Sequence, residues 1–457
     1  MNSNDFSILP LPDAMLCNLK ELGYREMTPI QAGSLPLILD NRDVIAQAKT
    51  GSGKTAAFGI GVLSKLDVKK FRVQSLVLCP TRELADQVAK ELRRLARFAH
   101  NIKVLTLCGG TAFGPQLGSL RHGAHIVVGT PGRVLQHLEK GSLLLDALET
   151  LVLDEADRML DMGFIEEITK VIDHAPLERQ TLLFSATFPD AIMQLCGTVQ
   201  RDPVTVRTIT EERPNRIIER FYGVARDAKL PTLIRILAHF RPERSIVFCN
   251  TKIEAREIAE SLHRKGIDAL AIHGDLEQYE RTDVLVQFAN RSCSVLVATD
   301  VAARGLDIKE LEAVVNYDMP QDPEVYTHRI GRTGRAGEEG LAFSLFTGDE
   351  ALDADAYRDG SRRFEEADEL PEAQHFILQP PNVTLVIEGG KKDKVRPGDI
   401  LGALTGEAGL EGKSVGKIDV YERQSYVAVE RAMAARAYER MKNGKIKGRK
   451  FSVWVLE

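Results

Sequence analysis

The sequence predicts an α/β protein made of two parallel-sheet domains and a smaller C-terminal α+β domain. Short apolar runs alternate with longer helical patterns between about residues 20 and 345, which is typical of parallel sheets covered by helices on both faces. A chain of 457 residues is also too long for a single hydrophobic core. Residues 382–457 carry 15 Lys and Arg against 10 Asp and Glu, whereas the whole chain carries 60 against 65. We therefore expect a basic module on an acidic body.

The apolar runs of strand length predict the elements of the two sheets. Examples are Asp43–Gln47, Ser75–Cys79, Ala124–Val128, Leu151–Leu153, Thr181–Phe184, Ser245–Cys249, Ser294–Ala298 and Ala313–Asn316. Between two of them, residues 83–98 place apolar side chains on one stripe, which predicts an amphipathic helix that covers a sheet face.

Two interruptions of this pattern predict the domain boundaries. Residues 207–216 are polar and contain a proline, and residues 348–381 are charged and end in two prolines, as expected of linkers. We therefore expect domains at 1–207 and 217–347, a connector at 348–381 and a third domain at 382–457.

The composition argues against a membrane or secreted protein. No apolar run approaches the roughly 18 residues needed to cross a bilayer, and the N-terminus lacks the basic and apolar regions of a signal peptide. The six cysteines form no C-x-x-C pair and show no metal-ligand spacing. We expect a cytoplasmic protein without a membrane partner.

One glycine-rich stretch predicts a phosphate-binding loop. The residues are Ala48, Lys49, Thr50, Gly51, Ser52, Gly53, Lys54 and Thr55, which match G-x-x-x-x-G-K-[ST] except for the first glycine. The stretch lies between a strand and a helix, so its backbone amides and the helix N-terminus favour bound phosphates. Lys54 is expected to reach the outer phosphates of ATP, and the Thr55 hydroxyl is expected to bind Mg²⁺.

A second Gly-Lys-Ser, at residues 412–414, is not expected to bind nucleotide. The first position of the corresponding pattern is Glu407, an anion where phosphate would lie. A helix precedes this stretch and a strand follows it, which reverses the order that a phosphate-binding loop requires.

An acidic cluster completes the expected ATP site. Asp154 and Glu155 follow the apolar strand Leu151–Leu153 directly, as the metal-binding acid does in other phosphate-loop enzymes. We expect Asp154 to hold Mg²⁺ and Glu155 to orient the attacking water.

Further motifs then identify a family. The chain resembles the DEAD-box ATP-dependent RNA helicases, because Gly23–Gln31, Pro80–Ala85, Gly109-Gly110, Thr130–Arg133, Ser185–Thr187, His273–Arg281, Ala298–Asp307 and Arg329–Arg335 stand in family order around the two sites above. Alone, each segment is also compatible with a turn, a helix cap or a solvated charged face. Together they imply two RecA-like parallel-sheet domains of the P-loop class.

The resemblance assigns roles to individual residues. It implies adenine contacts from Phe6 and Gln31, a ribose contact from Asp307, and arginine fingers at Arg332 and Arg335. It implies RNA contacts from Arg82, Gly110, Thr130, Arg133, Gln278, Arg281, Thr299 and Arg304. In this family, Ser185–Thr187 couples ATP hydrolysis to strand separation.

The last 76 residues predict an RRM-like RNA-binding domain. Strand and helix patterns follow the order βαββαβ, which is the topology of an RRM. The signature of base-stacking aromatics is poor, because Val386, Gln424 and Val429 occupy positions where an RRM usually has aromatic residues. Loop lysines such as Lys391 and Lys392 are expected to contact phosphates instead.

Over its full length the chain is similar to the bacterial DbpA-type branch of the family. The matching segments are Cys108–Gly110, Gly389–Lys392, Arg396–Asp399 and Gly402–Gly406. This resemblance implies a tail that binds 23S rRNA and a role in assembly of the large ribosomal subunit, on pre-50S particles. We expect a monomer. A DNA helicase or translocase of the same superfamily, and an RNA clamp gated by ATP, remain as alternatives.

Overall fold

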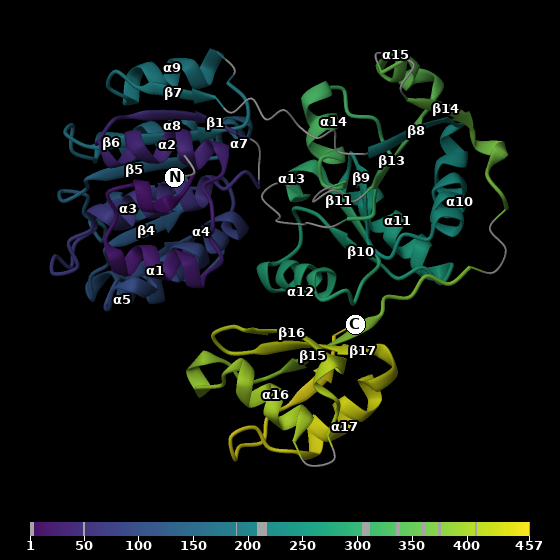
Figure 1. The fold of residues 1–457 in the computed structure, drawn as a ribbon. Coiled ribbons are helices and arrows are strands. Elements are labelled where there is room, and N and C mark those ends of the chain that lie inside the picture. Colours follow the sequence, from purple (N-terminus) through teal and green to yellow (C-terminus); the bar gives the residue numbers. More distant parts are fainter. Residues whose placement is uncertain are drawn as a thin grey trace. The chain divides into compact units, whose positions relative to one another are not determined.

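The computed structural model describes residues 4–48, 51–188, 190–207, 217–303, 311–334, 339–355, 357–358, 362–372, 376–406 and 409–456. The chain divides into two compact units, mainly Met1–Glu211 and mainly Glu212–Ala303 with Ile308–Glu457. Figure 1 shows the helices and strands of both.

The first unit contains a seven-stranded parallel sheet in the order β3-β4-β2-β5-β6-β1-β7. Its strands are β1 (Val44–Gln47), β2 (Ser75–Leu78), β3 (Val104–Leu107), β4 (Ile126–Gly129), β5 (Thr150–Asp154), β6 (Gln180–Ser185) and β7 (Val204–Arg207). Its helices are α1 (Asp13–Glu21), α2 (Pro29–Leu39), α3 (Lys54–Lys65), α4 (Arg82–Leu95), α5 (Phe113–Arg121), α6 (Pro131–Glu139), α7 (Ala156–Asp161), α8 (Ile165–Asp173) and α9 (Asp190–Val199).

Both faces of this sheet are buried, which explains its nearly continuous apolar strands. Val44 and Ala46 pack in one core with residues of α1 to α4, whereas Ile45 packs in a second core with residues of α6 to α9. Helix α4 ends at Leu95, and a short 3₁₀ helix, Ala96–Phe98, completes the amphipathic stretch expected at 83–98.

The second unit repeats this architecture in a seven-stranded parallel sheet ordered β10-β11-β9-β12-β13-β8-β14. Its strands are β8 (Ile217–Gly223), β9 (Ser245–Cys249), β10 (Ala269–Ile272), β11 (Val295–Thr299), β12 (Ala313–Asn316), β13 (Gly340–Phe346) and β14 (Arg363–Glu366). Its helices are α10 (Lys229–Phe240), α11 (Lys252–Arg264), α12 (Gln278–Ala289), α13 (Asp300–Ala303), α14 (Pro323–Ile330) and α15 (Ala351–Asp355).

The segment expected to be a connector is partly built into this second sheet. Its residues Arg363–Glu366 form β14, which pairs in parallel with β8 at the edge of the sheet. Leu370 and Leu378 are buried in the same core as the strands. In the described residues of 348–381, charged side chains therefore belong to the edge strand of a sheet and not only to a free linker.

The C-terminal part of the second unit is a four-stranded antiparallel sheet with two helices. The elements are β15 (Asn382–Ile387), α16 (Pro397–Thr405), β16 (Val415–Val420), β17 (Ser425–Glu430), α17 (Ala434–Asn443) and β18 (Val453–Val455), in the sheet order β16-β17-β15-β18. The predicted βαββαβ order is confirmed. One sheet face packs on α16 and α17 in a core that includes Leu385, Ile400 and Val427.

Candidate nucleotide and RNA sites

The first sheet brings three separate motifs to one edge. Strands β5, β6 and β1 are neighbours, and the acidic pair, Ser185–Thr187 and the phosphate-binding loop follow their respective carboxyl ends. Ligands of open parallel sheets bind outside the carboxyl ends of the strands. The loop after β1 is tied to β6 directly, since the Ala48 amide donates to the Ser185 carbonyl at 3.0 Å.

The described part of the phosphate-binding loop has the features that an anion requires. Gly53 has φ +95°, and a side chain there would overlap the Gln31 amide. Lys54, the first residue of α3, is only 6% exposed, and its Nζ has no hydrogen-bond partner among the described residues. A buried ammonium is costly unless it is paired. The site is therefore suited to a polyanion. Lys49 and Thr50 lie outside the described residues.

The acidic residues after β5 lie in different electrostatic surroundings. Burial raises the pKa of Asp154 to about 7, and the nearby charge of Lys54 opposes this shift. Glu155 has a left-handed backbone (φ 53°), and its carboxylate pairs with Arg158 Nη1 at 3.0 Å. Burial disfavours the charged form of a carboxylate, and a neighbouring cation stabilises that form. The donor set of Asp154 and the Thr55 hydroxyl fits Mg²⁺, which prefers oxygen ligands and keeps several waters.

Asp157 connects the acidic cluster to the loop after β6. Its Oδ2 accepts hydrogen bonds from the Ala186 amide (3.0 Å), the Thr187 amide (2.9 Å) and the Thr187 hydroxyl (3.2 Å). Burial acts to raise its pKa, but these hydrogen bonds and the charge of Lys54 outweigh burial and lower the pKa below its usual value. The two motifs therefore form one charge-assisted network.

The N-terminal segment supports the phosphate-binding loop. Gln31 is buried, its Nε2 donates to the Gly53 carbonyl at 3.1 Å, and its Oε1 accepts from the Thr28 amide at 2.9 Å. Phe6 packs edge-on against Tyr24, with ring centroids 6.3 Å apart. Both residues expected to contact adenine thus lie in the unit that carries the loop, and Gln31 touches it.

The other half of the first sheet carries the motifs expected to contact RNA. Strands β3, β4 and β2 are neighbours and precede Gly110, Thr130–Arg133 and Arg82. Gly110 has φ +67°, and a side chain there would overlap the Arg82 guanidinium. Arg133 donates to the Thr111 carbonyl at 3.0 Å and to Gln116 Oε1 at 2.8 Å. The sheet therefore separates a nucleotide half from an arginine-rich half.

The second sheet presents the remaining segments in the same way. Strands β11 and β10 are neighbours and precede Asp300 and the segment that enters α12. Gln278 begins α12, Thr299 ends β11, and Arg281 Nη2 donates to the Ala302 carbonyl at 2.6 Å, which joins the two segments. Arg332 follows α14. Arg304, Asp307, Arg335 and Glu407 lie outside the described residues.

Comparison with known proteins agrees with this arrangement. The family described as DEAD/DEAH box helicase matches residues 28–195, the helicase conserved C-terminal domain matches 228–337, and the DbpA RNA binding domain matches 384–455. The ATP-dependent RNA helicase DbpA of Escherichia coli (strain K12) is 54% identical over 449 residues, 98% of each chain.

The chain belongs to the DEAD-box RNA helicases, and within them to the DbpA type. It is thus an RNA helicase, and its family binds ATP and RNA. The DEAD-box helicase CshA of Geobacillus kaustophilus (strain HTA426) is 47% identical over 343 residues, 75% of this chain and 73% of the other. Among solved structures, S. cerevisiae Dbp5 bound to RNA and ADP BeF3 is 31% identical, covering 80% of this chain and 96% of its own, with a TM-score of 0.72.

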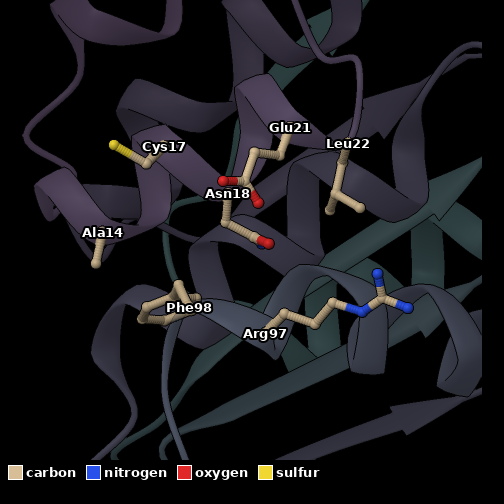
Figure 2. A pocket seen from close by; sticks show the side chains of 7 residues that line it. All are labelled: Ala14, Cys17, Asn18, Glu21, Leu22, Arg97 and Phe98. Carbon is tan, nitrogen blue, oxygen red and sulfur yellow. The ribbon is translucent and has the colours of Figure 1, made fainter.

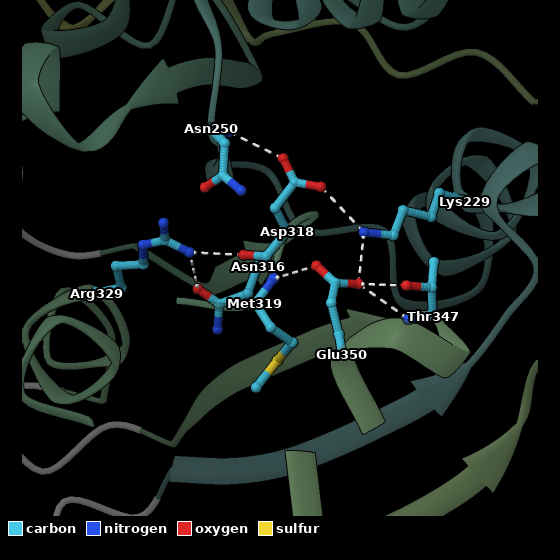
Figure 3. A network of polar contacts seen from close by, with 8 residues as sticks. All are labelled: Lys229, Asn250, Asn316, Asp318, Met319, Arg329, Thr347 and Glu350. Carbon is cyan, nitrogen blue, oxygen red and sulfur yellow. Dashed lines mark hydrogen bonds and ion pairs between the residues drawn. The ribbon is translucent and has the colours of Figure 1, made fainter. Parts of the chain in front are cut away.

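A polar network in the second unit of this DEAD-box helicase was not expected from the sequence (Figure 3). The buried Lys229 Nζ donates to Asp318 Oδ1 at 3.0 Å and to Glu350 Oε2 at 2.9 Å. The other oxygen of Asp318 accepts from the backbone N–H of Asn250 at 2.8 Å. Arg329 donates to the Asp318 carbonyl at 2.8 Å. The network holds together the loops after β9 and β12 and the helix that precedes Arg332.

Sequence reasoning missed this network because its members are scattered. Arg329 stands inside the recognised arginine motif, and it also pairs with Asp300 through Nη2 at 2.6 Å. Lys229, by contrast, is the first residue of an amphipathic helix, where a lysine is usually solvated. A lysine at the start of a helix, where the helix dipole disfavours cations, was the available signal.

The hollows described on the surface lie away from the nucleotide motifs. One of about 430 Å³ lies between α1 and the 3₁₀ helix Ala96–Phe98, lined by Ala14, Cys17, Asn18, Glu21, Leu22, Arg97 and Phe98 (Figure 2). A second of about 250 Å³ lies in the C-terminal domain, lined by Lys392, Asp393, Lys394, Val395, Ile446, Lys447, Arg449 and Phe451. Only the second is rich in cations.

None of the described helices is long and apolar enough to cross a membrane.

Proposed function

We propose that this DEAD-box helicase couples ATP hydrolysis to the local unwinding of short RNA duplexes in 23S rRNA, during assembly of the large ribosomal subunit. The observation that carries the proposal is the buried Lys54 ammonium, which lacks a hydrogen-bond partner among the described residues. Lys54 begins α3, after β1, and the other half of the same sheet precedes Arg82 and Arg133. Such a sheet is built to sense ATP on one side and RNA on the other.

In the proposed ATP site, Gln31 and Phe6 contact adenine, and residues 48–55 hold the phosphates. Asp154 and Thr55 bind Mg²⁺, which supplies charge neutralisation at the phosphates. Glu155 orients the attacking water. The second helicase domain contributes Asp307 at the ribose and the arginine fingers Arg332 and Arg335, and such fingers are worth roughly 10³- to 10⁵-fold in rate.

RNA completes this site by favouring closure of the two helicase domains. Arg82, Gly110, Thr130 and Arg133 on one domain, and Gln278, Arg281, Thr299 and Arg304 on the other, contact the same strand. RNA that touches both domains stabilises their closed arrangement, because a ligand shifts an equilibrium by its differential affinity. In the closed arrangement the bound strand is bent, so it separates locally from its complementary strand. Hydrolysis and phosphate release then reopen the domains.

The C-terminal domain, which we place at 382–457, supplies the RNA address. Exposed Lys391 and Lys392 and the cation-rich hollow between Lys392 and Arg449 are suited to phosphates. We assign residues 1–207 and 217–347 to the two helicase domains and 348–381 to their connection with the tail. The protein acts in the cytoplasm, where ribosomal RNA and ATP are available. It acts as a monomer.

The proposal is tested by ATP turnover with a panel of RNAs. A fragment of 23S rRNA should stimulate turnover more than an unrelated RNA or DNA, and Lys391→Glu with Lys392→Glu should remove that preference. Lys20→Glu, a change at an exposed lysine of α1, is the matched control. Equal stimulation by DNA would favour a DNA translocase instead.

Glu155→Gln separates an enzyme from an ATP-gated clamp. The amide preserves shape but cannot act as a base, so turnover should fall while ATP and RNA still bind. A clamp would release RNA at the same rate with either residue at this position.

A further inference from the structure

The sheet of the C-terminal domain is covered on its second face by the same unit's α12. Val386 of β15 and Tyr426 of β17 are fully buried in a cluster with Val286 of α12. The Tyr426 hydroxyl donates to Asp283 Oδ1 of α12 at 2.5 Å. These central positions are where an RRM commonly stacks bases. That platform is therefore closed by the protein itself.

Trp454 lies on this same face but outside the covered area. In the sheet register, Val386 stands opposite Tyr426 on one side and opposite Trp454 of β18 on the other. Directly opposed residues of antiparallel strands project from the same face. Trp454 is nevertheless 41% exposed, whereas Val386 is 1% exposed. Leu456, two residues further, packs against the covered cluster, so Trp454 lies at its border.

The surroundings of Trp454 are suited to nucleic acid. Strand β18 is an outer strand of the sheet, and the segment before it carries the exposed cations Lys445 and Lys450. Lys447 of the same segment instead pairs with Asp399 of α16 at 3.4 Å. Helix α12, which covers the neighbouring part of the sheet, begins at Gln278 and includes Arg281. Cations that hold phosphates beside an aromatic ring that stacks on a base form the common arrangement of single-strand binding sites.

We propose that Trp454 stacks on an unpaired base of the bound RNA, next to the α12 contact. This inference rests on the proposed function, since it assigns a base contact to the RNA-binding tail. Tryptophan presents a large rigid ring at low entropic cost. The stacking is tolerant of sequence, because every base has a π face. Trp454 thus adds affinity for a single-stranded flank, while phosphate contacts hold the structured part of the RNA.

The full-length protein contains its own reporter, because Trp454 is the one tryptophan of the chain. We would titrate it with a 23S rRNA hairpin that carries a single-stranded extension and with the same hairpin lacking the extension. Binding would be followed by anisotropy of labelled RNA and by tryptophan emission. Stacking should quench the emission with the extended RNA only, at the RNA concentration that the anisotropy midpoint gives.

Substitutions provide the second readout. Trp454→Ala should weaken binding of the extended hairpin by roughly 5- to 150-fold, the range expected for loss of one stacked base, and Trp454→Phe should retain most of the affinity. ATP turnover without RNA should be unchanged in both. Leu177→Ala removes an 81% exposed apolar side chain of the first unit and serves as the matched control.

Three outcomes would overturn the inference. One is that RNA binding leaves the tryptophan emission of the wild-type protein unchanged and that Trp454→Ala binds the extended hairpin as tightly as the wild type. Another is a concentration-dependent dimer that Trp454→Ala dissociates while RNA affinity stays constant, which would assign the edge of β18 to strand pairing between chains. Failure of the wild-type protein to bind either hairpin would overturn the proposed role of the tail, and the base contact with it.

Discussion

Replacing Lys229 by methionine should destabilise the second unit strongly. The substitution keeps the apolar stem but leaves the Asp318 and Glu350 carboxylates without their cation. The side chains of the two carboxylates are 9% and 21% exposed, and Lys229 itself is 6% exposed. Breaking a buried ion pair by removing one partner costs about 3–5 kcal/mol. Backbone donors still serve both carboxylates, including Asn250 N and Thr347 N, so the lower end of that range, about 3 kcal/mol, applies.

A loss of this size is measurable by calorimetry of the full chain. At about 2–4 °C for each kcal/mol in a domain of this size, the transition of the second unit should fall by roughly 6–12 °C. The control is Arg42→Met, which removes one member of the exposed 3.4 Å pair with Asp202 and should cost less than about 1 kcal/mol. Adding Asp318→Asn and Glu350→Gln to Lys229→Met should recover part of the loss. Equal shifts for Lys229→Met and the control would refute the argument.

Three further predictions follow from other sites. Asp157→Ala removes the acceptor of three hydrogen bonds from the loop after β6, so duplex unwinding should fall far more than ATP binding; parallel losses in a strand-displacement assay and a nucleotide-binding assay would contradict this. Gly110→Ala should displace Arg82 and weaken RNA binding about tenfold, the loss expected for one hydrogen bond to a charged group, at unchanged ATP affinity, and equal RNA affinity would disprove the contact. For Glu254, burial, a hydrogen bond and the charge of Asp318 raise the pKa from 4.5 to about 7. The folded chain therefore binds more protons than the unfolded chain in that window, and stability falls as the pH rises through it. Glu254→Gln should flatten this slope in urea midpoints taken at pH 5 and pH 8, whereas an unchanged slope would assign it to other groups.

Several strands that are buried on both faces could be predicted from the sequence. β2, β4, β5 and β9 have apolar centres, and every residue in them is buried. Edge strands escaped the same reasoning, because β7 alternates between half-buried and exposed residues and β14 is charged. An edge strand has one neighbour, and part of its surface faces water, so its composition resembles that of a loop.

The sequence by itself determined the class of the protein, its motifs and the order of its elements. Glycine spacing, a lysine before a helix and acids after a strand are local patterns, so the sequence alone shows them. The tertiary structure decided which groups meet: Lys229 with Asp318 and Glu350, Asp157 with the loop after β6, and Val286 with the sheet of the tail. These contacts join residues far apart in the chain. Their energies depend on burial and distance, which only packing sets.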